Sequence, residues 1–60
     1  FSFEGVLLDI IKVDVINIAI VAIGQQIVEV VISNIEAQNL IIGEKVNVST
    51  KAFSPTIKKI

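Results

Sequence analysis

The sequence contains no cysteine, no histidine and no arginine, and each absence removes a class of structure or function. Without cysteine the fold cannot be held by disulfides, and without cysteine or histidine a structural zinc site is excluded. No nucleophile–base pair of the Ser–His or Cys–His kind can be assembled, and the scattered acidic residues carry no companion signal for paired-carboxylate catalysis. We therefore predict that the protein is not an enzyme and uses no cofactor.

Aromatic and basic residues are also scarce, since three phenylalanines are the only aromatics and the net charge is −1. Nucleic-acid-binding surfaces usually combine clustered lysine and arginine with aromatic side chains on which bases stack. We therefore expect no nucleic-acid partner. The strand pattern alone keeps a nucleic-acid-binding OB-like barrel as a third-ranked alternative.

Long apolar runs are missing as well. The longest, residues 18–23, is far shorter than the roughly 20 residues that a membrane helix requires, and nothing resembles a signal peptide. We therefore predict no direct membrane insertion and a cytoplasmic location, with which the lack of cysteine is compatible. Because the chain starts at Phe1, we expect residues 1–60 to be a single domain and a fragment of a longer protein.

Isoleucine and valine are abundant, supplying 22 of the 60 residues, and their branched side chains favour strands over helices. Each of the three glycines precedes an apolar run, which is typical of turns leading into strands. Pro55 is expected just before the last strand, because proline cannot occupy a central strand. The predicted strands are residues 3–13, 15–23, 26–32 and 46–53, with a short fifth at 56–60.

The second and third of these strands are apolar on both alternating faces, which indicates that both faces are covered. A barrel interior covers one face, and a partner subunit is the simplest cover for the other. A chain of this length also has a marginal core when it stands alone. We therefore predict a homo-oligomer, a dimer or larger.

One short helix is predicted at residues 34–39. Ser33 and Glu36 fit a capping box, in which the serine hydroxyl accepts a hydrogen bond from the third helical N–H and the glutamate reaches back. Ile35, Ala37 and Leu40 are expected to face the barrel. The complete fold prediction is all-β: a five-stranded OB-like small barrel with one short helix.

The order of these signals resembles the TOBE, or Mop-like, domain of molybdate- and tungstate-binding proteins. The resemblance covers Gly5 to about Ile57 and consists of the opening Gly5-Val6, alternating strands, an Ile-Ser entry into a short helix, Gly-x-x-Val, and the closing Lys-Ala of "VNVSTKAF". Members of that family have a five-stranded OB-like barrel. They occur as free storage proteins, as C-terminal regulatory domains of molybdate ABC-transporter ATPases and in molybdate-responsive regulators.

The resemblance implies a function and a site. Family members hold a tetrahedral oxyanion at subunit contacts with backbone N–H groups, hydroxyls and a lysine, and these positions fall on Ser33, Lys51 and Ala52. Molybdate or tungstate is the implied ligand. At the position of a second family hydroxyl stands Glu36, whose carboxylate competes with an anion for the same N–H groups.

Two further expectations remain open. The alternative function is a regulatory or dimerisation domain that binds no ligand and accompanies an ABC-transporter ATPase domain in the same chain. Lys58 and Lys59 are expected in a terminal tail, where their charge keeps an apolar edge soluble rather than binding the anion.

Overall fold

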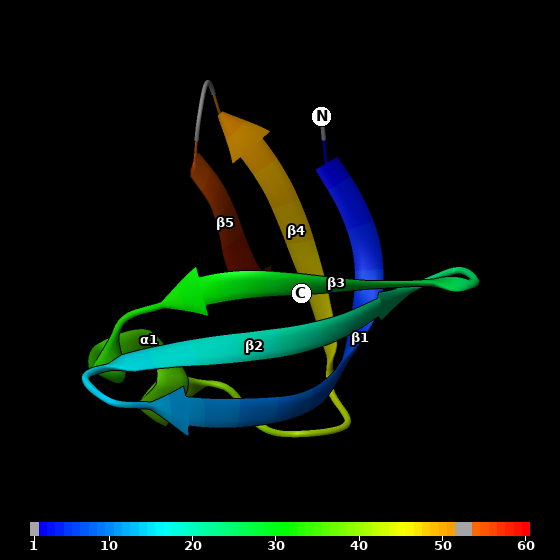
Figure 1. Cartoon of the computed structure of the whole chain (residues 1–60). Helices are drawn as coiled ribbons and strands as arrows, with labels where there is room; N and C mark the ends of the chain where they lie inside the picture. Colours follow the sequence, from blue (N-terminus) through cyan, green and yellow to red (C-terminus); the bar gives the residue numbers. More distant parts are fainter. Residues whose placement is uncertain (1, 52–53) are drawn as a thin grey trace.

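The computed structural model describes residues 2–51 and 54–60 of the chain, and it is built almost entirely of antiparallel strands (Figure 1). The predicted all-β class is confirmed, with five strands and one short helix. The elements are β1 (Ser2–Val13), β2 (Ile16–Ile23), β3 (Gln26–Ile32), α1 (Asn34–Asn39), β4 (Lys45–Lys51) and β5 (Ser54–Lys59). No helix in the described ranges is long and apolar enough to cross a membrane.

Left-handed backbone conformations mark the turns between the elements. Asp14 (φ 59°) lies in the turn from β1 to β2, and Gly24 (φ 61°) lies in the turn from β2 to β3. Gly43 (φ 97°) lies in the turn before β4. Glycine and aspartate tolerate this conformation better than branched residues do, so the turns fall where the chain interrupts its isoleucine and valine runs.

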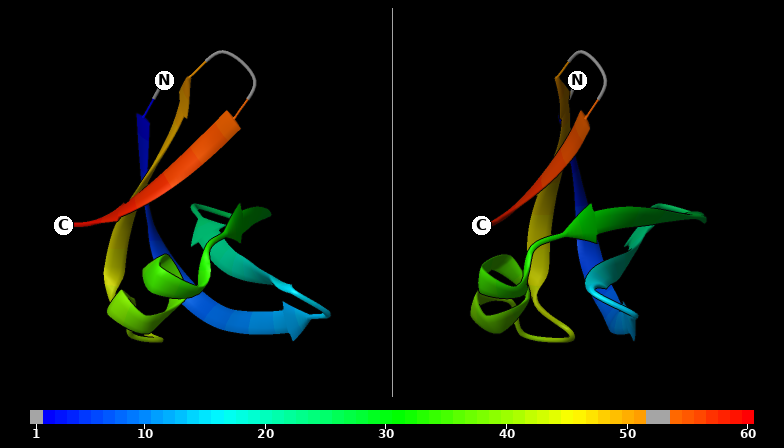
Figure 2. Two further views of the ribbon diagram at one scale, coloured as in Figure 1. Left: turned by 90° about the vertical axis from the view of Figure 1, so that its left-hand side faces the viewer. Right: turned by 60° about the vertical axis from the view of Figure 1, so that its left-hand side comes forward.

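The strands form one sheet in the order β3-β2-β1-β4-β5. The long strand β1 takes part in both halves: residues 2–6 pair with β4, and residues 6–13 pair with β2 around a register shift between Leu7 and Asp9. Such an irregularity bends a strand, and β1 curves visibly between the two halves (Figures 1 and 2). The sheet therefore curls back over its own inner face.

The curled sheet is barrel-like but open. Strands β3 and β5 contact each other, yet the ladder ends at these two strands, with no backbone pairing between them in residues 2–51 and 54–60. The last strand begins two residues earlier than predicted, so Pro55 lies within β5 rather than just before it; β5 is at the edge of the sheet, where a missing N–H costs no central hydrogen bond.

The core is made by the inward-facing positions of all five strands. Its buried residues are Leu7, Ala19, Val21, Val30, Ile32, Val46, Val48 and Ile57. Ala37 and Leu40 pack against this cluster, as predicted, so α1 covers one end of the core. Ile35 does not, because 72% of it is exposed. The prediction that Ile35 faces the barrel is wrong, because so short a helix points only part of its surface toward the core.

Most strand boundaries agree with the sequence prediction. Strand β2 begins one residue late, at Ile16, because the turn at Asp14 also takes up Val15. Strand β4 begins at Lys45, while Phe53, its predicted end, lies outside the described residues. The inner face of the sheet is covered as expected, whereas the outer face of β1, β2 and β3 is not covered by any described part of this chain.

Candidate functional site

Ser33 is the N-cap of α1 and is engaged within its own turn. Its hydroxyl accepts a hydrogen bond from the Glu36 N–H (3.1 Å), while its own backbone N–H donates to Glu36 Oε1 (3.0 Å). The predicted capping box is therefore confirmed. The same contacts fill the polar groups that an anion would use at Ser33, and they place a carboxylate beside them.

The other two predicted ligands are Lys51, at the end of β4, and the next residue in the sequence, Ala52. Lys51 is the last residue of β4, and its backbone pairs with Ser54 of β5. Its side chain lies outside the described residues, as does the whole of Ala52. Lys51 follows Asn47 and Ser49 along β4, so the residues around those two side chains form the neighbourhood of the predicted site.

A cleft of about 370 Å³ lies on the outer side of β1, β4 and β5. These three strands are adjacent in the sheet, which brings together residues from the two ends of the chain (Figure 2). The cleft is lined by Ser2, Asn47, Ser49, Lys58, Lys59 and Ile60. Five of these six side chains are polar, and the two charged ones are both cationic.

Register explains why these residues meet. Ser2 pairs with Ser49, which pairs with Thr56, so three hydroxyl-bearing residues form one row across β1, β4 and β5. In the next row Asn47 pairs with Lys58. Because every second residue of a strand faces the same side, the two rows share the outer face.

Hydrogen bonds within the cleft orient its polar groups. Ser2 Oγ donates to Asn47 Oδ1, which leaves the Asn47 NH₂ group as the donor that this side chain offers. The hydroxyls of Ser49 and Thr56 are 2.8 Å apart, and the Thr56 hydroxyl also donates to the Ser49 carbonyl oxygen at 3.5 Å, so both hydroxyl hydrogens have acceptors within this pair. Lys58 is exposed and adds an ammonium group. The cleft thus combines neutral donors with positive charge.

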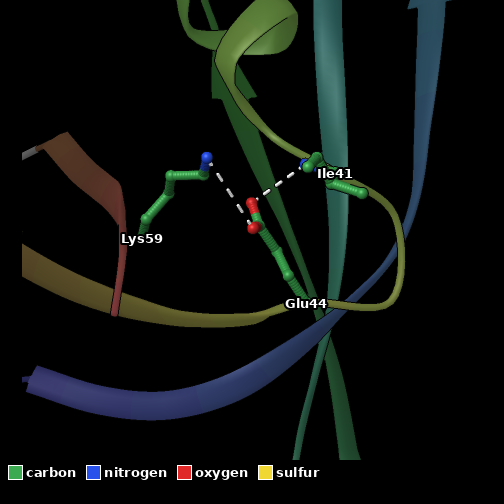
Figure 3. A network of polar contacts seen from close by, with 3 residues as sticks. All are labelled: Ile41, Glu44 and Lys59. Carbon is green, nitrogen blue, oxygen red and sulfur yellow. Dashed lines mark hydrogen bonds and ion pairs between the residues drawn. The ribbon is translucent and has the colours of Figure 1, made fainter.

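Lys59 is tied to the neighbouring turn. Its ammonium nitrogen lies 3.9 Å from Glu44 Oε2, while the other carboxylate oxygen of Glu44 accepts a hydrogen bond from the Ile41 N–H at 2.9 Å (Figure 3). Part of the Lys59 charge is therefore neutralised by Glu44. Lys58, whose only ladder neighbour on this face is the neutral Asn47, is the stronger cation for a ligand.

Sequence reasoning found part of this site. The alternation of Asn47, Ser49 and Lys51 on one face of a strand is visible in the sequence, but Ser2 and Lys58 join that face only through pairing between distant strands. Both residues were therefore missed. Lys58 and Lys59 lie in a paired strand rather than a terminal tail, so that part of the prediction is wrong.

No cluster of three or more aspartate, glutamate, histidine or cysteine side chains suited to a metal ion occurs in the part of the chain that the structure describes. Comparison with known proteins gives no match to a family model, a curated protein or a solved structure.

Proposed function

We propose that this protein is a binding module for a small tetrahedral oxyanion, molybdate or tungstate, in the transport, storage or regulation of these metals. The observation that carries the proposal is the cleft on β1, β4 and β5, where hydroxyls, an amide and Lys58 surround about 370 Å³ of open space. The sequence resemblance to TOBE or Mop-like domains supports the same ligand class.

The chemistry of the cleft suits a small dianion. Oxyanion oxygens accept hydrogen bonds from neutral donors such as the Asn47 NH₂ group, whose Oδ1 is already occupied by Ser2. A charge-assisted bond from the Lys58 ammonium adds roughly 1.5–3 kcal/mol. The overall net charge of −1 provides no long-range attraction, so the affinity must come from these local groups.

Lys51 remains a proposed ligand, whereas Ser33 is replaced in the site by residues of the cleft. Strand alternation predicts Lys51 on the face shared by Asn47 and Ser49, two residues beyond Ser49. Ser33 is assigned to helix capping instead, because its polar groups are already paired with Glu36. Lys58 takes a binding role in addition to the protection of an edge strand.

The wider setting that we propose follows from the same resemblance. The module acts in the cytoplasm and accompanies an ABC-transporter ATPase domain in a longer chain, where occupancy of the cleft reports the oxyanion concentration. Molybdate, tungstate and sulfate share charge and shape and differ chiefly in size, so titration with all three defines the ligand.

Calorimetric titration of molybdate, tungstate and sulfate at fixed ionic strength tests the proposal. We expect Lys58→Gln to weaken binding roughly tenfold to a hundredfold, as loss of one charge-assisted hydrogen bond predicts. Lys12→Gln is the matched control: it removes the same charge from an exposed position in β1, away from the cleft, and should leave the affinity unchanged.

A second variant has the opposite sign. Glu4 on β1 pairs with Asn47 without lining the cleft, one strand spacing from Asn47 and two from Lys58, so its carboxylate repels a bound dianion. Glu4→Gln should therefore tighten binding a few-fold. Absence of heat and of thermal stabilisation with all three anions would refute the proposal and favour the ligand-free regulatory alternative.

A further inference from the structure

Glu44 connects the turn before β4 with the end of β5. One oxygen of its carboxylate accepts a hydrogen bond from the Ile41 N–H at 2.9 Å, and the other lies 3.9 Å from the Lys59 ammonium nitrogen (Figure 3). Lys59 also lines the cleft on β1, β4 and β5, whereas Glu44 does not. One cation of the cleft therefore has a carboxylate neighbour that lies outside the cleft.

The position of Glu44 is fixed by its own turn and by β1. Its backbone N–H donates to the Ile41 carbonyl oxygen at 3.1 Å, and its carbonyl oxygen accepts a hydrogen bond from the Leu7 N–H at 3.0 Å. The Gly43 N–H donates to the Leu7 carbonyl oxygen at 2.7 Å, which ties the turn to β1 a second time. Together with the side-chain hydrogen bond to Ile41, these contacts hold the carboxylate in one place.

Lys59 is the mobile partner of this pair. Its ammonium nitrogen is 3.9 Å from the carboxylate oxygen, longer than the roughly 2.7–2.9 Å of a charge-assisted hydrogen bond. Glu44 therefore attracts Lys59 by charge without a hydrogen bond between them. The Lys59 side chain is 50% exposed and has a flexible four-carbon stem. Its ammonium group can move from Glu44 toward an anion in the cleft without breaking a hydrogen bond.

We propose that Glu44 is an internal counter-anion that competes with the oxyanion for Lys59 and thereby sets the concentration at which the cleft fills. This role of Glu44 rests on the proposed oxyanion binding and adds to it a residue that does not touch the ligand. When the cleft is empty, Glu44 attracts Lys59. A bound anion draws Lys59 away, so the lost attraction to Glu44 lowers the net affinity.

Lys58 differs from Lys59 in this respect. Among the described side chains, no carboxylate lies within ion-pair distance of Lys58, so an anion gains its charge without a competitor. The cleft thus has one cation that is always available and one that is shared with Glu44. By linkage, the anion weakens the attraction between Glu44 and Lys59 by the same factor by which Glu44 weakens anion binding.

Glu44→Gln separates the charge of Glu44 from its part in the turn. Glutamine keeps a side-chain oxygen that can accept the Ile41 N–H, so the turn should persist while the attraction for Lys59 is lost. Ion pairs between partly exposed side chains are weak, so calorimetric titration with molybdate at fixed ionic strength should show binding tightened roughly twofold to fivefold. Circular dichroism checks that the fold is unchanged.

Glu36→Gln is the matched control. The Glu36 carboxylate also accepts a hydrogen bond from a backbone N–H three residues away, that of Ser33, but no described lysine lies within ion-pair distance of it and it does not line the cleft. Glu36→Gln removes the same charge from the chain and should leave the molybdate affinity unchanged. A tightening equal to that of Glu44→Gln would show an effect of net charge alone and would overturn the inference.

A double-mutant cycle tests whether Glu44 acts through Lys59. Lys59→Gln alone should weaken molybdate binding less than Lys58→Gln does, because part of the Lys59 charge is already neutralised by Glu44. In the Lys59→Gln background, Glu44→Gln should no longer tighten binding. Glu4→Gln, which acts by direct repulsion, should tighten binding in both backgrounds.

The outcomes separate this inference from the proposed function. No heat with molybdate in the unmodified chain or in any variant overturns both. Molybdate binding that Glu44→Gln leaves unchanged overturns only the competition by Glu44, and so does equal tightening by Glu44→Gln with and without Lys59. Binding that becomes measurable only in Glu44→Gln supports the competition, provided that Lys59→Gln abolishes the gain.

Discussion

Replacement of Gly5 by alanine is the sharpest test of how β1 serves both halves of the sheet. Gly5 is buried in the curved part of β1 and pairs with Val46 of β4. A Cβ atom at this position would lie 2.5 Å from the carbonyl oxygen of Ala22 and 2.8 Å from Cγ1 of Val21. Such distances are shorter than any real contact. The nearest atom is backbone, which cannot rotate away as a side chain does.

The size of the effect follows from these contacts. Overpacking by one carbon typically costs about 1–3 kcal/mol, and more where the backbone has to move. A chain of 60 residues has a total stability of roughly 3–9 kcal/mol at about 0.05–0.15 kcal/mol per residue. Gly5→Ala should therefore remove a third or more of the stability and lower Tm by on the order of 10 °C.

Urea unfolding followed by circular dichroism measures this change. The experiment is done at low protein concentration, because self-association would add to the apparent stability. Gly24→Ala is the control: its Cβ would meet nothing within 4 Å, but its φ of 61° makes alanine cost about 1 kcal/mol. If Gly5→Ala and Gly24→Ala unfold at the same urea concentration, the close approach of β2 to Gly5 does not make alanine at position 5 more destabilising than alanine in a turn.

Three smaller predictions concern the helix and the turn before β4. Ser33→Ala should lower the free energy of unfolding by about 1 kcal/mol through loss of the N-cap, with the oxyanion affinity measured by calorimetry unchanged. Asn34→Ala should cost about 1–3 kcal/mol in urea unfolding, because the buried Asn17 Nδ2, now 2.6 Å from Asn34 Oδ1, loses its acceptor. Glu44→Ala should speed hydrogen exchange at the Ile41 amide, and unchanged exchange would count against the hydrogen bond between them.

The elements of the fold were predictable where the signal is local. The capping box of Ser33 and Glu36 placed the helix at residues 34–39, as observed, because both of its hydrogen bonds join residues three apart. The turn at Gly24 was visible for the same reason. The turn at Asp14 was placed one residue short, since nothing in the sequence distinguishes Val15 in a turn from valine in a strand.

The pairing of β1 with β4 was not predictable, and neither was the cleft that depends on it. Ser2 and Ser49 face each other across 47 positions of sequence, and Lys58 reaches Asn47 from the opposite direction along the chain. Alternation identifies which residues share a face of one strand, but it does not specify which strands are neighbours. The open gap between β3 and β5 escaped prediction for the same reason, because closure is a property of the whole sheet.

The sharing of β1 between the two halves of the sheet sets an order of events during folding. Strands β1, β2 and β3 are joined by two-residue turns and pair with their neighbours in sequence, whereas β1 meets β4 only after a long loop has closed. Because local contacts form faster than distant ones, we expect amides of β2 and β3 to gain protection before those of β4 in pulse-labelled hydrogen exchange. The exposed apolar face of β1, β2 and β3 would then be complete while the polar cleft on β1, β4 and β5 does not yet exist.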